Sequence, residues 1–103
     1  MAKKRAVKTL EEVIEVLQKY KEEISQKYKV KEIGVFGSFV RGEQKRGSDV
    51  DMLVEYYELP DLLELIDLEL YLSRLLKKKV DLIEKSGIRK ELKEKILNEA
   101  IYL

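Results

Sequence analysis

The chain has 103 residues, a length typical of one domain, and its 45% hydrophobic residues are enough to form a core. Its 21 basic and 20 acidic residues leave a net charge of +1, which provides no general attraction to nucleic acid or to acidic membranes. The absence of cysteine and histidine excludes disulfides, thiolate chemistry and a histidine base. Any catalysis must therefore use carboxylates, hydroxyls, lysine, arginine, backbone amides or a hard metal ion.

The first half of the chain is predicted to form a long helix, a strand and a short helix. Residues 9–28 carry apolar side chains at helical spacing, and Thr9 with Glu12 predicts a capping box at the N-terminal end. Residues 30–37 read as a strand that ends in an apolar run. A short helix is expected to begin near Ser38, and a polar loop then returns the chain.

The second half is predicted to add two strands and two helices. Residues 49–56 alternate as a strand, and a helix follows over 61–77. Residues 78–84 form a third strand, and 88–103 form the last helix. The order αβαβαβα predicts an α/β (α+β) fold, in which a single domain over residues 1–103 has a small mixed β-sheet packed against helices.

The helix over 61–77 carries more apolar residues than one buried face requires. One stripe contains Leu65, Leu68, Leu72, Leu75 and Leu76, and a second stripe on nearly the opposite side contains Leu63, Ile66 and Leu70. Either the helix is covered on both sides within its own fold, for example by the C-terminal helix, or the second stripe is a partner surface. Both alternatives stay open at this point, and so does the choice between a homo-oligomer and a hetero-oligomer.

Two local basic runs, at residues 3–5 and 77–79, are interpreted as a chain terminus and a helix end, because cations are favoured at helix C-termini. The sequence shows neither a signal-peptide pattern nor an apolar run long enough to span a membrane. We therefore expect a cytoplasmic protein that has no membrane segment.

Two aspartates stand at the start of the second predicted strand. Asp49 and Asp51 are two residues apart, so their side chains project to the same face of a strand. Asp81 lies on the third strand and would complete a three-carboxylate cluster if that strand pairs beside the second. Carboxylates at this range raise one another's pKa unless a cation lies between them. Mg²⁺ prefers such oxygen ligands, and two ions about 4 Å apart would suit an in-line displacement at phosphorus.

A glycine–serine turn precedes the aspartates and supplies a predicted phosphate site. Gly37 ends a strand and permits a tight turn, and Ser38 begins a helix whose amides and hydroxyl can hold a phosphate. Arg41 could reach the same anion, or it could be a surface residue that pairs with Glu43 or Glu55. The turn alone and the aspartate pair alone are each common without function, but their combination with a later strand aspartate is much more specific.

The segment GSFVRGEQKRGSDVDMLVEY, residues 37–56, resembles the signature of the nucleotidyltransferase superfamily that includes DNA polymerase β. It is most similar to the minimal nucleotidyltransferase (MNT) group, with its pattern G-S-x-x-R-G-x(5)-S-D-x-D followed by a strand aspartate. The resemblance runs over nearly the whole chain, and Met52 stands where Ile or Leu is more usual. It implies that Gly37, Ser38, Arg41 and Ser48 bind the nucleotide. It also implies that Asp49, Asp51 and Asp81 are catalytic and hold two Mg²⁺ ions.

The resemblance further implies a reaction and a partner. MNT proteins transfer AMP from ATP to a tyrosine of a HEPN-domain ribonuclease toxin and act as its antitoxin, and a protein acceptor suits a chain of 103 residues. Three alternatives differ in class: a binding-only antitoxin, an enzyme that modifies a small molecule, and a nucleic-acid polymerase. The nucleic-acid polymerase is disfavoured, because a net charge of +1 gives no sign of a basic groove that could hold a template. No nucleic-acid partner is therefore expected.

Overall fold

A computed structural model describes residues 6–103, so the basic run at residues 3–5 lies outside the described part. The elements in chain order are α1 (Leu10–Tyr28), β1 (Val30–Phe36), α2 (Ser38–Arg41), β2 (Val50–Tyr56), α3 (Leu62–Leu76), β3 (Val80–Glu84), the 3₁₀ turn η1 (Lys85–Gly87), α4 (Lys90–Glu99) and β4 (Ile101–Tyr102).

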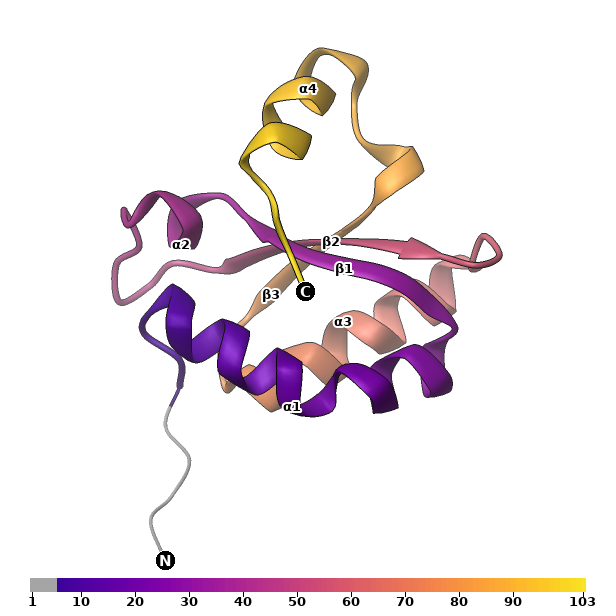
Figure 1. Cartoon of the computed structure of the whole chain (residues 1–103), viewed down its shortest axis with the longest axis horizontal. Helices are drawn as coiled ribbons and strands as arrows, with labels where there is room; N and C mark the ends of the chain where they lie inside the picture. Colours follow the sequence, from indigo (N-terminus) through magenta and orange to yellow (C-terminus); the bar gives the residue numbers. More distant parts are fainter. Residues whose placement is uncertain (1–5) are drawn as a thin grey trace, which may run out of the picture.

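The four strands form one mixed sheet in the order β3-β2-β1-β4. β1 is antiparallel to both β2 and β4, whereas β2 and β3 are parallel. A parallel pair needs a crossover, and α3 supplies it. Figure 1 shows α1 and α3 together on one side of the sheet and α4 on the other side. The structure confirms the predicted mixed sheet packed against helices.

The main hydrophobic core lies between the sheet and the α1–α3 layer. Its fully buried side chains come from both helices and from the facing side of the strands: Val13, Leu17, Val35, Val50, Met52, Val54, Leu68, Leu72 and Leu76. The alternation along β2 places Leu53 on the opposite side, toward α4, and it is fully buried as well. β2 is therefore an inner strand of the sheet, with a paired strand on each edge and buried apolar side chains on both faces.

The helix ends follow from local capping. Thr9 accepts a hydrogen bond from the Glu12 N–H at 3.2 Å, but the Glu12 carboxylate accepts from the Lys8 N–H rather than from that of Thr9. Only half of the predicted capping box is therefore formed on α1. The complete box occurs on α3, where Asp61 and Glu64 cap each other's backbone N–H groups.

The C-terminal end of α1 offers a direct test of backbone strain. Lys29 has φ 57° and ψ 39°, a left-handed conformation that costs an L-residue about 1 kcal/mol and costs glycine little. We expect Lys29→Gly to raise the free energy of unfolding by about 1 kcal/mol, or the melting temperature by about 5 °C. Lys29→Ala is the matched control and should change little. If thermal unfolding shows the same gain in stability for Lys29→Gly and Lys29→Ala, the gain comes from loss of the lysine side chain and not from relief of backbone strain.

The predicted last helix is wrong in its final residues. α4 ends at Glu99, Ala100 is extended, and the chain continues as β4. β4 pairs with β1 through Gly34↔Tyr102 and Val35↔Ile101, so it covers what would be an open sheet edge. A Cβ on Gly34 would lie 3.1 Å from Tyr102 Cδ1, which shows how closely the two strands approach. The order therefore gains a strand after the last predicted helix.

The second apolar stripe of α3 is not covered by the fold. Leu63, Ile66 and Leu70 are 76%, 42% and 49% exposed, because α4 lies on the far side of the sheet rather than against α3. The interpretation that α3 is sandwiched within its own fold is therefore wrong. We call these three residues the α3 apolar patch. They line a hollow bordered by Asp61, Glu64 and Asp67.

Candidate active site

The β1–α2 turn is built around Gly37. This residue has φ 79° and ψ −152°, a conformation that is essentially restricted to glycine. A Cβ at this position would overlap the Asp51 carboxylate, so the glycine also permits the close approach of β2. Ser38 begins the single-turn helix α2, and the buried Phe39 anchors it to the core. The predicted phosphate turn therefore lies directly against Asp51, one of the three predicted metal ligands.

The strand register places Asp51 beside Asp81, two of the three predicted carboxylates. Asp51 on β2 is the partner of Phe36 on β1 and of Asp81 on β3, and Asp49 precedes β2 by one residue. The condition stated from the sequence, that the third strand pairs beside the second, is met. Burial raises the pKa of Asp51 most, and the negative charges of Asp81 and Asp49 raise it further. A carboxylate in these surroundings favours either a proton or a nearby cation.

The donor set suits Mg²⁺, although the side chains do not form a closed cage. Within residues 6–103, no three acidic side chains converge closely enough to form a ready-made metal site. Asp81 is exposed, and Asp49 lies 3.9 Å from the Lys79 ammonium. Mg²⁺ commonly takes only one or two protein carboxylates and completes its shell with water and substrate phosphates. Asp51 with its neighbours therefore fits such an ion, and metal binding by the three aspartates stays a prediction.

Ser48 and Arg41 have other partners within this structure. The Ser48 hydroxyl accepts a hydrogen bond from the Lys45 N–H at 2.7 Å, and the Ser48 N–H donates to the Lys45 carbonyl at 2.9 Å. Ser48 thus closes the turn that leads into Asp49. Arg41 Nε lies 2.6 Å from Glu43 Oε1, the pairing considered from the sequence, whereas Glu55 pairs with Lys85 instead. A nucleotide contact for either residue stays a prediction.

Glu99 is a site residue that the sequence did not indicate. Its carboxylate accepts a short hydrogen bond from the Gly37 N–H, and both of its oxygens lie 3.0 Å from Arg41 Nη1. The hydrogen bonds that the Arg41 guanidinium donates to Glu43 and to Glu99 raise the pKa of Arg41. Glu99 reaches the turn because α4 ends there and β4 runs beside β1. No local motif marks this residue, and the sequence placed it only within the last predicted helix over 88–103.

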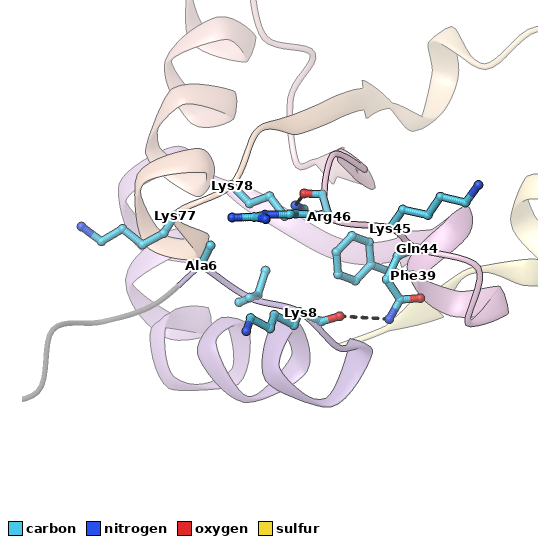
Figure 2. Close-up of a pocket in the computed structure, with 9 residues that line it drawn as sticks. Ala6, Lys8, Phe39, Gln44, Lys45, Arg46, Lys77 and Lys78 are labelled. Carbon is cyan, nitrogen blue, oxygen red and sulfur yellow. Dashed lines mark hydrogen bonds between the residues drawn. The ribbon is translucent and has the colours of Figure 1, made fainter.

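A separate pocket lies on the side of the sheet that carries α1. Its volume is about 720 Å³, and Figure 2 shows basic side chains around Phe39. Lining residues within the described part include Lys8, Lys45, Arg46, Lys77 and Lys78, and no carboxylate is among them. Gln44 Nε2 donates to the Lys8 carbonyl at 3.0 Å and links the loop to the start of α1. The pocket offers no metal ligand and is distinct from the aspartate site.

Comparison with known proteins agrees with this geometry. A family model described as a nucleotidyltransferase domain matches residues 17–103. The chain belongs to this nucleotidyltransferase family, and it is an enzyme of the nucleotidyltransferase class.

Among the residues that the structure describes, no helix combines the length and the apolar character needed to cross a bilayer.

The relatives narrow the class to minimal nucleotidyltransferases of the MntA type. A Thermococcus cleftensis protein named protein adenylyltransferase MntA is 47% identical over 98 residues, which cover 95% of this chain and 99% of that protein. A solved structure of a candidate minimal nucleotidyltransferase has a TM-score of 0.79 and 32% identity, and the match covers 96% of this chain and 100% of the other. A toxin–antitoxin crystal structure with AMP-PNP has a TM-score of 0.68 and 25% identity, over 89% of this chain and 69% of the other.

Proposed function

We propose that this protein transfers AMP from ATP to a hydroxyl, most simply that of a tyrosine, on a HEPN-domain toxin and acts as the antitoxin of that partner. The hydroxyl oxygen bonds to the α-phosphorus of ATP, the bond from that phosphorus to the bridging oxygen of the β-phosphate breaks, and pyrophosphate leaves. The observation that carries the proposal is the register that places Asp51 opposite Asp81, directly beside the Gly37–Ser38 turn. The similarity to a protein adenylyltransferase and to a toxin–antitoxin complex with an ATP analogue supports the same reaction and the same kind of partner.

The proposed roles follow from position and chemistry. Gly37 and Ser38 hold the triphosphate through backbone N–H groups and the serine hydroxyl. Asp49, Asp51 and Asp81 would hold two Mg²⁺ ions. Bound there, Mg²⁺ would supply charge neutralisation at the phosphates and a lower pKa for the attacking hydroxyl. Because the chain has no histidine, a carboxylate such as that of Asp81 accepts the proton of the hydroxyl.

Arg41 and Ser48 are proposed to support the nucleotide site from its edge. Arg41 follows Ser38 within one helical turn and provides the positive charge beside the phosphate turn. Ser48 keeps the chain closed just before Asp49 through its two bonds with Lys45. Such residues orient the groups that bind substrate, so their loss should weaken the reaction less than loss of an aspartate.

The decisive experiment is mass spectrometry of a HEPN-type partner after incubation with this protein, ATP and Mg²⁺. The proposal predicts a mass gain by whole AMP units, and peptide mapping should place the gain on a tyrosine. Chelation of the metal with EDTA should prevent it. A tight complex with no mass gain would instead support the second candidate, a binding-only antitoxin that neutralises its partner by covering it.

The α3 apolar patch is the proposed docking surface for the partner. An exposed apolar cluster bordered by acidic side chains fits an apolar partner surface with a basic rim. We expect Leu63→Glu to weaken the complex at least about thirtyfold in a direct binding titration, since it places a charge in the centre of the contact. Leu92→Glu is the control, because Leu92 is exposed on α4, across the sheet. Equal loss in both variants would argue against this surface.

A further inference from the structure

We propose that the Glu99 carboxylate and the ATP triphosphate compete for the same donors, so that Glu99 sets the affinity of the site for nucleotide. This inference rests on the proposed function, because it concerns the same phosphate turn. It assigns to the end of α4 a role in nucleotide binding beyond that of the motif residues.

The contacts of Glu99 are those expected of a bound anion. Its carboxylate takes the Gly37 N–H, the amide that opens the phosphate turn, and it pairs with the Arg41 guanidinium through both oxygens. The side chain of Glu99 is only 16% exposed, so these contacts are made largely away from water. Backbone amides and guanidinium groups bind carboxylates and phosphates in the same way, through charge-assisted hydrogen bonds. The Gly37 N–H has one hydrogen, so Glu99 and a phosphate cannot both hold it, and the two anions would have to share the Arg41 guanidinium.

Electrostatics favour exchange over simultaneous binding. Glu99 contributes to the raised pKa of Asp51, so its charge already acts on the carboxylate site. The Glu99 carboxylate forms a salt bridge with Arg41, and Arg41 also forms a salt bridge with Glu43. A phosphate on the Gly37–Ser38 turn would lie directly against the Glu99 carboxylate if Glu99 did not move, and the two groups carry like charges. The negative charge of Glu99 therefore opposes nucleotide binding for as long as it stays on the turn.

The attachment of α4 makes the movement of Glu99 feasible. None of the side chains of α4 is buried, and the helix ends at Glu99 in an extended Ala100. The two residues of β4 hold the following segment to β1. Glu99 can thus leave the turn by rotating its own side chain or by a small shift of α4, with little loss of apolar contact.

The experiment compares Glu99→Gln with the wild type by calorimetric titration of Mg·ATP and, separately, of inorganic tripolyphosphate. Glutamine keeps the size of the side chain and removes its charge. The contact with the Gly37 N–H then becomes a neutral hydrogen bond, and the contact with Arg41 loses its ion pair. We expect the affinity for both ligands to rise about five- to tenfold. Glu94→Gln removes a charge from the exposed surface of α4 and should leave both affinities unchanged.

A purely structural anchor would behave differently. If Glu99 only ties α4 to the turn, Glu99→Gln should leave affinity unchanged or weaken it, and either result overturns the inference. In an Arg41→Met background the gain should shrink, because a shared donor is gone. Should Glu99→Gln fail to fold, Glu99→Asp tests the same point, since its shorter reach should also tighten binding. Failure of the wild type to bind either ligand would contradict the proposed function itself, and the inference with it.

Discussion

Asp51→Asn is expected to reduce AMP transfer at least about a thousandfold while the fold stays intact. Asp51 lies at the meeting point of β1, β2 and β3 and against Gly37, so it is the carboxylate best placed to hold a metal ion against the phosphates. Asparagine keeps the shape but loses the charge, and a metal contact of this kind is worth several kcal/mol of transition-state stabilisation. The measurement is the rate of AMP incorporation into the partner. Glu22→Gln, on the exposed face of α1, is the isosteric control.

The same substitution should stabilise the metal-free protein at neutral pH. The pKa of Asp51 is raised in the folded state, so the folded protein binds a proton there more readily than the unfolded chain does. Above the raised pKa the ionised carboxylate therefore costs stability, and this cost disappears as the pH falls through that pKa. Asparagine removes the cost, so melting temperatures in EDTA should be higher for the variant at pH 7 and should converge toward acid pH.

The loss of AMP transfer and the gain in melting temperature are separate predictions for Asp51→Asn, and each can fail without the other. Full AMP transfer by Asp51→Asn would contradict the metal assignment. A lower melting temperature at every pH would mean that the Asp51 carboxylate makes a stabilising contact, contrary to the raised pKa. A variant that is both inactive and more stable would identify Asp51 as a residue kept for function at the expense of stability.

Gly37→Ala is expected to abolish transfer and to destabilise the protein by about 3 kcal/mol. The backbone conformation of this residue alone costs an L-residue about 1–3 kcal/mol. The added Cβ would also overlap the Asp51 carboxylate, which pushes the turn away from β2. Urea denaturation measures the stability, and AMP incorporation measures the activity of the fraction that remains folded.

Two other glycines provide matched controls within the same motif. Gly42 has φ 72° but open space around its Cβ position, so Gly42→Ala should cost only about 1 kcal/mol, from backbone strain alone. Gly47 has neither a positive φ nor a neighbour within 4 Å, so Gly47→Ala should be tolerated. Equal effects at all three positions would show that the overlap with Asp51 does not matter. The expected order is Gly37, then Gly42, then Gly47.

Much of the fold and of the site could be predicted because the governing signals are local. The apolar spacing of residues 9–28 specifies a helix face, and the alternation in 49–56 specifies a strand. Two aspartates at i and i+2 share a face wherever that strand goes, and Asp81 joins them because a parallel strand after a crossover helix pairs beside the first. Only the pairing itself had to be assumed.

The remaining features depend on contacts between distant parts of the chain. By itself, the sequence determined the elements up to β3, the glycine–serine turn and the aspartates, since each rests on hydrogen bonds and spacing within a few residues. Only the tertiary structure decided that residues 101–102 form a strand and that the α3 apolar patch is left exposed. It alone also placed Glu99 on Gly37, 62 positions away. Whether a segment pairs as an edge strand, whether a helix face is covered and which group a carboxylate contacts all depend on distant parts of the chain. The spacing of residues along the sequence does not contain that information.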